Sequence, residues 1–376
     1  MDGKQGLDGV VAATTRLSSV DGEAGVLLIA GFPVEDLAPL ATFEETAYLL
    51  WNGALPDAAE LAAFSRRLAG RRALPEATLA LLRAAAQRRA PMMDALRMAA
   101  GTLSLGAQAG DDPQEDAATL VAAFPAIVAS YWRLLEGKEP LAPRQDLGHA
   151  ASFLYLLAGE EPAPARVRGL ETYLNTVIDH GFNASTFAAR VIVSTHSDLV
   201  SAVTGAVGAL KGPLHGGAPG PALDMVFEIG TADRAEAVLR EKLARGERLM
   251  GFGHRVYRVR DPRADVLAAA AERFYQSGGD VALYQLARSV EATALRLLRE
   301  HKPDRPLDTN VEFYTALLLH GLGMPTELFT PTFAISRVAG WTAHCLEQLA
   351  HGRLIRPQSE YVGERDRRWV PMEARG

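Results

Sequence analysis

The chain has 376 residues, 48% of them hydrophobic and 22% charged, which is typical of a globular protein with a large core and about two domains. Its net charge of −6 argues against a nucleic acid or an anionic membrane surface as partner, because both favour a basic excess. The single cysteine, Cys345, excludes an intrachain disulfide and a metal site of the zinc-finger type.

The N-terminal segment, 1–16, mixes acidic and basic side chains and has no long apolar stretch, which excludes a secretory signal and an arginine-rich transit peptide. We therefore expect a soluble protein of the cytoplasm, although a single cysteine is equally compatible with secretion. The longest uncharged run, 117–132, contains Pro125 and is shorter than the ~20 residues of a membrane-spanning helix. We expect this run to be a buried helix.

The hydrophobic periodicity predicts helices almost throughout, and therefore a mainly α fold. The first predicted helix follows a capping box of Thr42 and Glu45 and ends at Gly53, and a second lies between Asp57 and Gly70. Further helices are predicted at 75–87, 92–105, 113–135, 170–179, 184–210, 234–244, 262–275, 281–300, 311–320 and 331–351. Strand signals are few, and segment 25–30 is the best of them, as part of a short hairpin.

Two loops rich in glycine and proline, 211–221 and 321–331, mark the predicted domain seams. Residues 1–216 and 321–376 would form a large helical domain, and residues 217–320 a smaller helical domain inserted into it. Functional sites often lie in a cleft between domains, so side chains near these seams are candidates for a site.

Three short blocks, 211–217, 250–255 and 310–314, each hold one proton-handling side chain. These side chains are His215, His254 and Glu312. Glycines beside both histidines remove the Cβ atoms that would keep a ligand away from the backbone. Two histidines and one carboxylate suffice for concerted acid–base chemistry at carbon.

Each block also has a purely structural interpretation. His215 follows a helix in a turn, and Glu312 is a first-turn carboxylate behind the N-cap residue Asn310, where the helix dipole favours it. A nucleotide-binding loop at 251–253 is a weak interpretation, because valine occupies position 256 where the third glycine would stand. No metal-ligand spacing links the histidines, and no serine-hydrolase elbow is present.

Three arginines are candidates for binding an anion. Arg263 occupies the second position of a helix that begins with Asp261 as N-cap, where a cation opposes the helix dipole. Arg337 lies in an otherwise apolar helix, where a buried arginine needs either a bound anion or a structural ion pair. Arg356 would by itself be an ordinary surface cation.

Four segments, 180–190, 212–217, 251–263 and 310–313, occur together in an order and spacing that resemble the citrate synthase family. Segments 6–10 and 43–45 are also similar to it, and the resemblance covers about 6–362. It implies a two-domain helical fold and a Claisen-type condensation of acetyl-CoA with oxaloacetate, followed by hydrolysis of citryl-CoA, the reaction of the tricarboxylic acid cycle. By resemblance, Glu312 is the base, His215 hydrogen-bonds the forming enol, and His254 donates to the carbonyl of oxaloacetate.

The resemblance also implies the binding residues and the partners. The expected oxaloacetate ligands are His180, Asn183, Arg263, Arg337 and Arg356. The expected CoA-binding residues are Leu214, Met250, Gly251, Phe252, Gly253, Arg258, Arg305 and Asn310. Arg356 would come from the partner subunit of a homodimer. The CoA thioester is a substrate, and no further cofactor and no metal are expected.

The sequence departs from the usual pattern of the family at three places. The base is commonly aspartate, and Glu312 adds one methylene that moves the carboxylate by about 1 Å, a displacement that can lower a rate on the order of 10²-fold without a compensating backbone shift. Pro219 stands where many relatives have asparagine, and the arginine usual near 30–31 is missing.

Three alternatives to a citrate synthase stay open. A 2-methylcitrate synthase would use propionyl-CoA with the same residues, and one methylene gives a pocket only ~1–3 kcal/mol of discrimination. A weakly active relative that binds CoA or a dicarboxylate is the alternative from a different class of protein. A citryl-CoA lyase role is less favoured.

Overall fold

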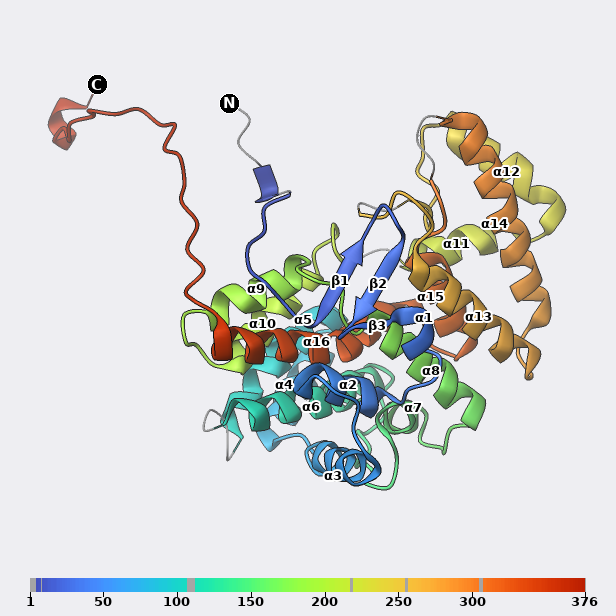
Figure 1. The fold of residues 1–376 in the computed structure, drawn as a ribbon, viewed down its shortest axis with the longest axis horizontal. Coiled ribbons are helices and arrows are strands. Elements are labelled where there is room, and N and C mark those ends of the chain that lie inside the picture. Colours follow the sequence, from blue (N-terminus) through green and yellow to red (C-terminus); the bar gives the residue numbers. More distant parts are fainter. Residues whose placement is uncertain are drawn as a thin grey trace.

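The computed structural model describes residues 5–7, 9–106, 112–216, 219–253, 256–303 and 307–375. This part of the chain consists of α-helices and one small antiparallel sheet, which confirms the predicted mainly α fold (Figure 1). The α-helices are α1 (Val34–Leu37), α2 (Phe43–Asn52), α3 (Ala58–Ala69), α4 (Glu76–Gln87), α5 (Met92–Thr102), α6 (Pro113–Leu135), α7 (His149–Ala158), α8 (Pro164–Val177), α9 (Ala184–Val193), α10 (Leu199–Leu210), α11 (Pro219–Ile229), α12 (Ala235–Ala244), α13 (Pro262–Gln276), α14 (Val281–His301), α15 (Val311–Gly321) and α16 (Phe329–His351). The strands are β1 (Ser18–Asp21), β2 (Val26–Ile29) and β3 (Phe32–Pro33), in the order β1-β2-β3.

The core is built around α6 and α16, which pack against each other and carry unbroken runs of buried side chains. By length and composition α6 could cross a membrane, but 72% of its most apolar window is buried inside the protein, as in the core helix of a soluble protein. The prediction of a buried helix at 117–132 is thus confirmed, and Pro125 is accommodated within it.

The helix boundaries follow the capping signals where these are local. Thr42 and Glu45 form the reciprocal capping box, and α2 ends at Gly53 in the left-handed conformation. The predicted single helix 184–210 is wrong, because the chain leaves helical geometry between α9 and α10. His196 has φ 63° there, and Asp198 caps α10 through the amide of Ser201. The helices α1, α7 and α11 were not predicted from the sequence.

The predicted strand at 25–30 is β2, and with β1 it forms a hairpin registered Ser18↔Ile29 to Asp21↔Val26. The turn of this hairpin packs against the loop that leads into α13. Gly22 accepts a hydrogen bond from the Arg258 amide, and a Cβ on Gly25 would lie 2.7 Å from Val259. The hairpin therefore supports the segment that carries the candidate residue Arg263.

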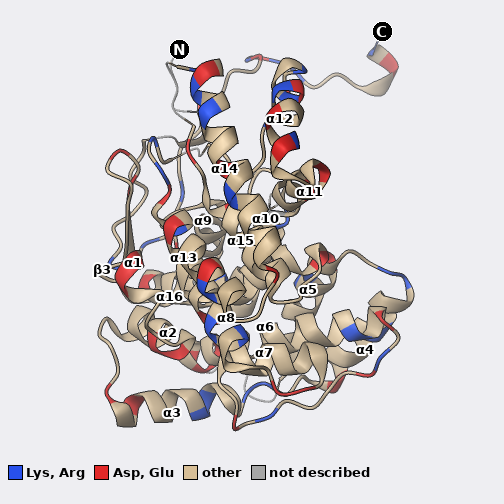
Figure 2. Cartoon of the chain, turned by 90° about the vertical axis from the view of Figure 1, so that its right-hand side faces the viewer, with Lys and Arg blue, Asp and Glu red and all other residues tan. Residues whose placement is uncertain are grey.

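Helices α11 to α15 lie at one side of the molecule (Figure 1). Charged residues are frequent along α12 and α14, whereas α10 and α15 are largely uncharged (Figure 2). Within this group α13 packs on α15 and also on α8, which belongs to the rest of the fold. The proposed domain division, with 217–320 as the small domain, stays a prediction. Independently of this division, α8 contacts α13, α15 and α16, so these four helices meet.

Candidate active site

The segment after α8 supplies the first polar groups of the site. Asp179 is fully buried and accepts hydrogen bonds from Ser18 Oγ at 2.5 Å and from His344 Nε2 at 3.2 Å. Burial by itself would raise the pKa of this carboxyl, but His344 and Arg337 outweigh it and hold the pKa below its usual value. The next residue, His180, is partly buried, and its Nε2 lies 3.1 Å from the Tyr257 hydroxyl.

Arg337 enters the site from the middle of α16 and is only 1% exposed. Its Nε donates to the carbonyl of Val177 at 2.7 Å, and the guanidinium lies 4.5 Å from the ring centre of Phe333. Among the described residues no carboxylate lies within ion-pair distance of it. Burial lowers its pKa to about 10, so Arg337 is a buried cation at neutral pH without a full partner.

Arg263 is also buried, and its anion is the N-cap residue of its own helix. Two guanidinium nitrogens, Nε and Nη2, donate to Asp261 at 3.0 and 2.8 Å. This contact resolves the sequence anomaly, because the N-cap carboxylate compensates the cation that would otherwise oppose the helix dipole. The Asp261 carboxylate also accepts the Val311 amide at 3.3 Å, which joins the N-termini of α13 and α15.

Glu312 is held in the first turn of α15, as predicted, behind the N-cap Asn310. Its side chain is half-buried, and within the described part of the chain its carboxylate accepts no hydrogen bond. Burial raises its pKa to about 7, while Arg263 lowers it and Asp261 raises it. A carboxylate with a pKa near the working pH is suited to act as a general base.

His215 follows α10 and is also half-buried. Burial lowers its pKa to about 4, and the Arg337 charge adds to this effect, so the ring is neutral at physiological pH. Electrostatic interactions therefore connect His215 to Arg337, Arg337 to Arg263, and Arg263 to Glu312. The fold brings these four predicted residues, which come from four different parts of the chain, into one site.

Ser185, which was not predicted, connects His215 to the core. Its Oγ lies 2.8 Å from His215 Nε2 and 2.8 Å from Asn183 Oδ1, and it accepts Trp341 Nε1–H at 3.0 Å. The indole can only donate, so the single Ser185 hydroxyl proton can be donated either to Asn183 Oδ1 or to His215 Nε2. When it goes to His215 Nε2, the neutral ring carries its own proton on Nδ1. No local signal in the sequence marks this contact, which spans 156 residues between Ser185 and Trp341.

Asn183, predicted as an oxaloacetate ligand, uses its side chain within the protein. Its Oδ1 caps α9 by accepting the Thr186 amide at 3.1 Å, and its Nδ2 donates to Gly181. In this structure Asn183 thus shapes the turn that carries His180 and the first turn of α9.

The predicted CoA segment, Met250 to Gly253, runs beside the start of α15. Phe252 pairs with Thr309 in a β-bridge, and Asn310 donates from Nδ2 to the Gly253 carbonyl at 2.8 Å. Gly251 has φ 88°, and a Cβ there would lie 2.9 Å from Phe313. The glycine is therefore required by packing inside the protein, besides any approach of a ligand.

The other predicted CoA residues differ in exposure. Leu214 is fully exposed at 103%, and Arg258 is an exposed cation 3.9 Å from Glu23. His254 and Arg305 lie outside the described residues. Among the described residues no group of three His, Cys, Asp or Glu side chains could hold a metal ion.

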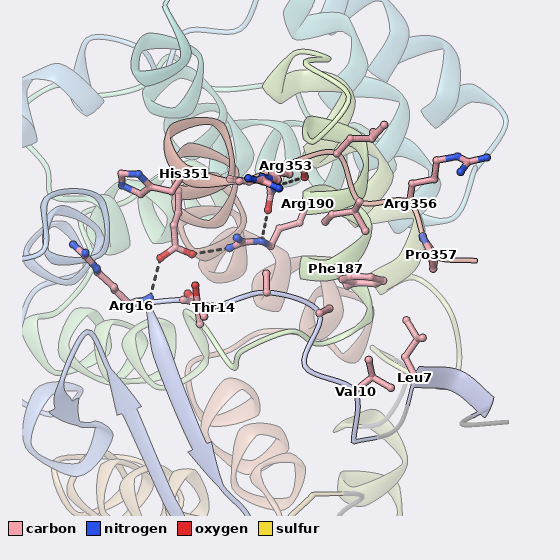
Figure 3. Close-up of a pocket in the computed structure, with 18 residues that line it drawn as sticks. Leu7, Val10, Thr14, Arg16, Phe187, Arg190, His351, Arg353, Arg356 and Pro357 are labelled. Carbon is pink, nitrogen blue, oxygen red and sulfur yellow. Dashed lines mark hydrogen bonds and ion pairs between the residues drawn. The ribbon is translucent and has the colours of Figure 1, made fainter. Parts of the chain in front are cut away.

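Arg356 is not brought to the other predicted oxaloacetate ligands within one chain. It lies on the exposed C-terminal segment, at a cavity of about 620 Å³ between residues 7–16, α9 and the end of α16 (Figure 3). The buried Arg190 forms one wall of this cavity and pairs with Glu347 at 2.7 Å. The lining also contains Arg16 and Arg353, so the cavity is strongly cationic.

Together these groups define a helical protein with an acid–base site for an anionic substrate. Glu312 can accept a proton, a neutral imidazole can donate a hydrogen bond, and the buried Arg337 can hold a carboxylate beside Arg263, which is paired with Asp261. Such a site suits proton abstraction from carbon and the formation of a bond to a carboxylate-bearing acceptor.

Comparisons with known proteins agree with this description. Residues 6–358 match the family model described as citrate synthase, C-terminal domain. The chain is 42% identical to a citrate synthase of Haloferax volcanii, with 99% of both chains covered, and 42% identical to a 2-methylcitrate synthase of Mycobacterium tuberculosis, with 97% of this chain and 92% of the other covered. It also resembles the structure of a Thermoplasma acidophilum citrate synthase in a ternary complex with carboxymethyl coenzyme A and oxaloacetate. The TM-score is 0.88 and the sequence identity is 31%, with 99% of both chains covered.

The chain therefore belongs to the citrate synthase family, and it is an enzyme of that family. This finding confirms the resemblance identified from the four sequence segments.

Proposed function

We propose that the protein condenses acetyl-CoA with oxaloacetate and hydrolyses the resulting citryl-CoA, releasing citrate and CoA. The observation that carries the proposal is that Glu312, Arg263, Arg337 and His215 interact electrostatically in one site. Glu312 is a base with a pKa of about 7, and the two arginines are buried cations. Oxaloacetate provides the carboxylates that Arg337 lacks within the described protein, and planar guanidinium groups bind carboxylates through two parallel hydrogen bonds.

In the proposed reaction Glu312 removes a proton from the methyl carbon next to the thioester carbonyl. His215 donates a hydrogen bond to the oxygen that becomes the enol, through Nδ1–H when Ser185 donates to Nε2. Because the pKa of His215 is low, the donor is a neutral imidazole, which matches a weakly acidic enol better than an imidazolium would. The enol carbon then attacks the oxaloacetate carbonyl, to which His254 would donate. Water finally cleaves the thioester.

The binding residues follow from the same proposal. Oxaloacetate would lie between Arg263, Arg337 and His180, and Asn183 would support the turn beneath His180. CoA would lie along Met250 to Gly253 and Leu214, near Asn310, with Arg258 and Arg305 toward its phosphates. The Thermoplasma complex with a CoA analogue and oxaloacetate supports this pair of ligands.

A 2-methylcitrate synthase is the second candidate, because a relative of that name is as similar to this chain, at 42% identity, as a citrate synthase. The two are separated by measuring free-thiol release from acetyl-CoA and from propionyl-CoA, with and without oxaloacetate. We expect oxaloacetate-dependent release that is faster, by kcat/KM, with acetyl-CoA. A higher value with propionyl-CoA would assign the second function, and no release with either thioester would favour a binding protein.

We further propose a cytoplasmic homodimer in which each site receives Arg356 from the partner subunit. Beyond Gly352 the chain extends away from the helices (Figure 1), and the segment exposes large apolar side chains such as Trp369, which is 79% exposed. An extended segment with unburied aromatic side chains is typical of a chain that packs on another subunit. This arrangement would also explain why Arg356 is far from its predicted partners within one chain.

Complementation tests the shared site. Arg356→Ala and Glu312→Gln homodimers are each expected to be nearly inactive. Their mixed dimer has one site that contains both substitutions and one site with neither, so it should recover about half of the wild-type turnover per dimer. The dimers would be made by co-expression with two tags, and the two purified homodimers mixed without subunit exchange are the control. Activity no higher than that of the mixed homodimers would contradict donation of Arg356 across the interface.

A further inference from the structure

Glu291, on α14, is a buried carboxylate to which four side chains donate hydrogen bonds. It is 4% exposed. Its Oε1 accepts Arg260 Nη1 at 2.9 Å and Thr309 Oγ1 at 2.7 Å. Its Oε2 accepts Arg288 Nη1 at 3.0 Å and the Tyr314 hydroxyl at 2.5 Å. All four acceptor positions of the carboxylate are therefore used.

Two of the donors, Arg260 and Thr309, adjoin the segments that carry the candidate substrate cation and the candidate base. Arg260 directly precedes Asp261, the carboxylate that holds Arg263. Thr309 directly precedes Asn310, the N-cap that holds the first turn of Glu312. One oxygen of Glu291 thus joins the segment of Arg263 to the segment of Glu312.

The contacts to Glu291 are strong enough to fix these segments. Burial by itself would raise the pKa of Glu291, but the hydrogen bonds from Tyr314, Thr309 and Arg260 outweigh it and hold the pKa below its usual value. The carboxylate is therefore ionised, and hydrogen bonds to an ionised acceptor are about twice as strong as neutral ones. The same two segments are also joined by the packing of α13 on α15 and by the 3.3 Å contact of Asp261 with the Val311 amide.

We propose that Glu291 is a positioning residue that sets the distance between the base Glu312 and the substrate-binding Arg263. The inference rests on the proposed function, and it adds a residue that touches no substrate. A displacement of about 1 Å between a base and its bound substrate can lower the rate on the order of 10²-fold, so the separation of these segments controls the rate directly.

Three disruptive substitutions and one conservative substitution test the hydrogen bonds that Glu291 accepts from the two segments. Thr309→Val removes only the hydrogen bond on the base side, so kcat should fall about 10-fold while the KM for oxaloacetate changes less than about 2-fold. Arg260→Met removes the bond on the Arg263 side and should raise that KM about 10-fold with a smaller effect on kcat. Glu291→Gln removes the charge and places an amide N–H₂ against donors, so both parameters should worsen, with kcat/KM falling about 100-fold. Thr309→Ser keeps the hydroxyl and should restore kcat.

Glu44→Gln is the matched control for removing a buried carboxylate away from the site. Glu44 is also a carboxylate that is 4% exposed, and it accepts the His149 amide on the other side of the fold. Glutamine keeps an oxygen that can accept this amide, so the variant removes a buried carboxylate outside the site and should leave kcat and KM unchanged. If the kinetic parameters of Glu291→Gln match those of Glu44→Gln, or if Thr309→Val alters KM and kcat equally, the positioning role is wrong. A wild-type protein without oxaloacetate-dependent thiol release would instead refute the proposed function, and the inference with it, before any variant is compared.

Discussion

Replacing Glu312 by glutamine is expected to lower kcat by at least about 10³-fold, because the amide cannot accept the proton that a general base removes. Oxaloacetate binding should persist, since Arg263 and Arg337 keep their charges and the substitution removes a neighbouring negative charge. Thiol release measures the first quantity, and titration calorimetry with oxaloacetate alone measures the second. Near-normal turnover in this variant would refute the assignment of the base.

Glu312→Asp is the matched control, because it keeps the carboxylate but withdraws it by about 1 Å and should lose on the order of 10²-fold in kcat. The pH profile gives an independent check. Glu312 must be deprotonated to act, and its pKa is about 7, so kcat/KM should rise as the pH increases through 7. His215, with a pKa of about 4, is already neutral over this range, so its titration should not change kcat/KM between pH 6 and 8. A flat profile between pH 6 and 8 would contradict the role of Glu312.

Arg337→Gln is expected to weaken oxaloacetate binding by about 30-fold or more, since losing one partner of a buried, hydrogen-bonded charge pair costs about 2–5 kcal/mol. The same change should leave the Tm of the ligand-free protein unchanged or raise it. The reason is that Arg337 is 1% exposed and meets no carboxylate among the described residues, so its charge opposes folding until a ligand arrives. Calorimetric binding and thermal unfolding, each with and without oxaloacetate, measure both effects.

Arg190→Gln is the control for the stability effect. Arg190 is 2% exposed like Arg337, but it has a carboxylate partner, Glu347 at 2.7 Å, and it also donates to Gln348. Its loss leaves these acceptors unpaired and should lower Tm. If Arg337→Gln lowers the ligand-free Tm as much as Arg190→Gln does, then Arg337 is part of a structural ion network and not a site awaiting an anion.

The sequence predicted those features that depend on neighbours along the chain. The caps at Thr42, Asp57, Asp261 and Asn310 all form as expected, because each needs only an amide two or three residues away. The polar stretch between α9 and α10 is also a local signal for a helix break, but the apolar, alanine-rich sequence on both sides of it led to the prediction of one continuous helix. The order of the four family segments identified the family without any knowledge of the fold.

Only the tertiary structure decided the chemistry of the predicted residues. The pKa of Glu312 depends on how deeply α15 is packed, and the low pKa of His215 depends on burial and on Arg337, 122 positions away in the sequence by their numbers. Ser185 and Glu291 carry no signal of their own, because a serine or glutamate on a helix is common and its partners lie far along the chain. The sequence by itself thus determined the family, most of the helices and the candidate reacting groups. Packing determined their protonation, their partners and their separation, since burial and long-range contacts exist only once the helices have met.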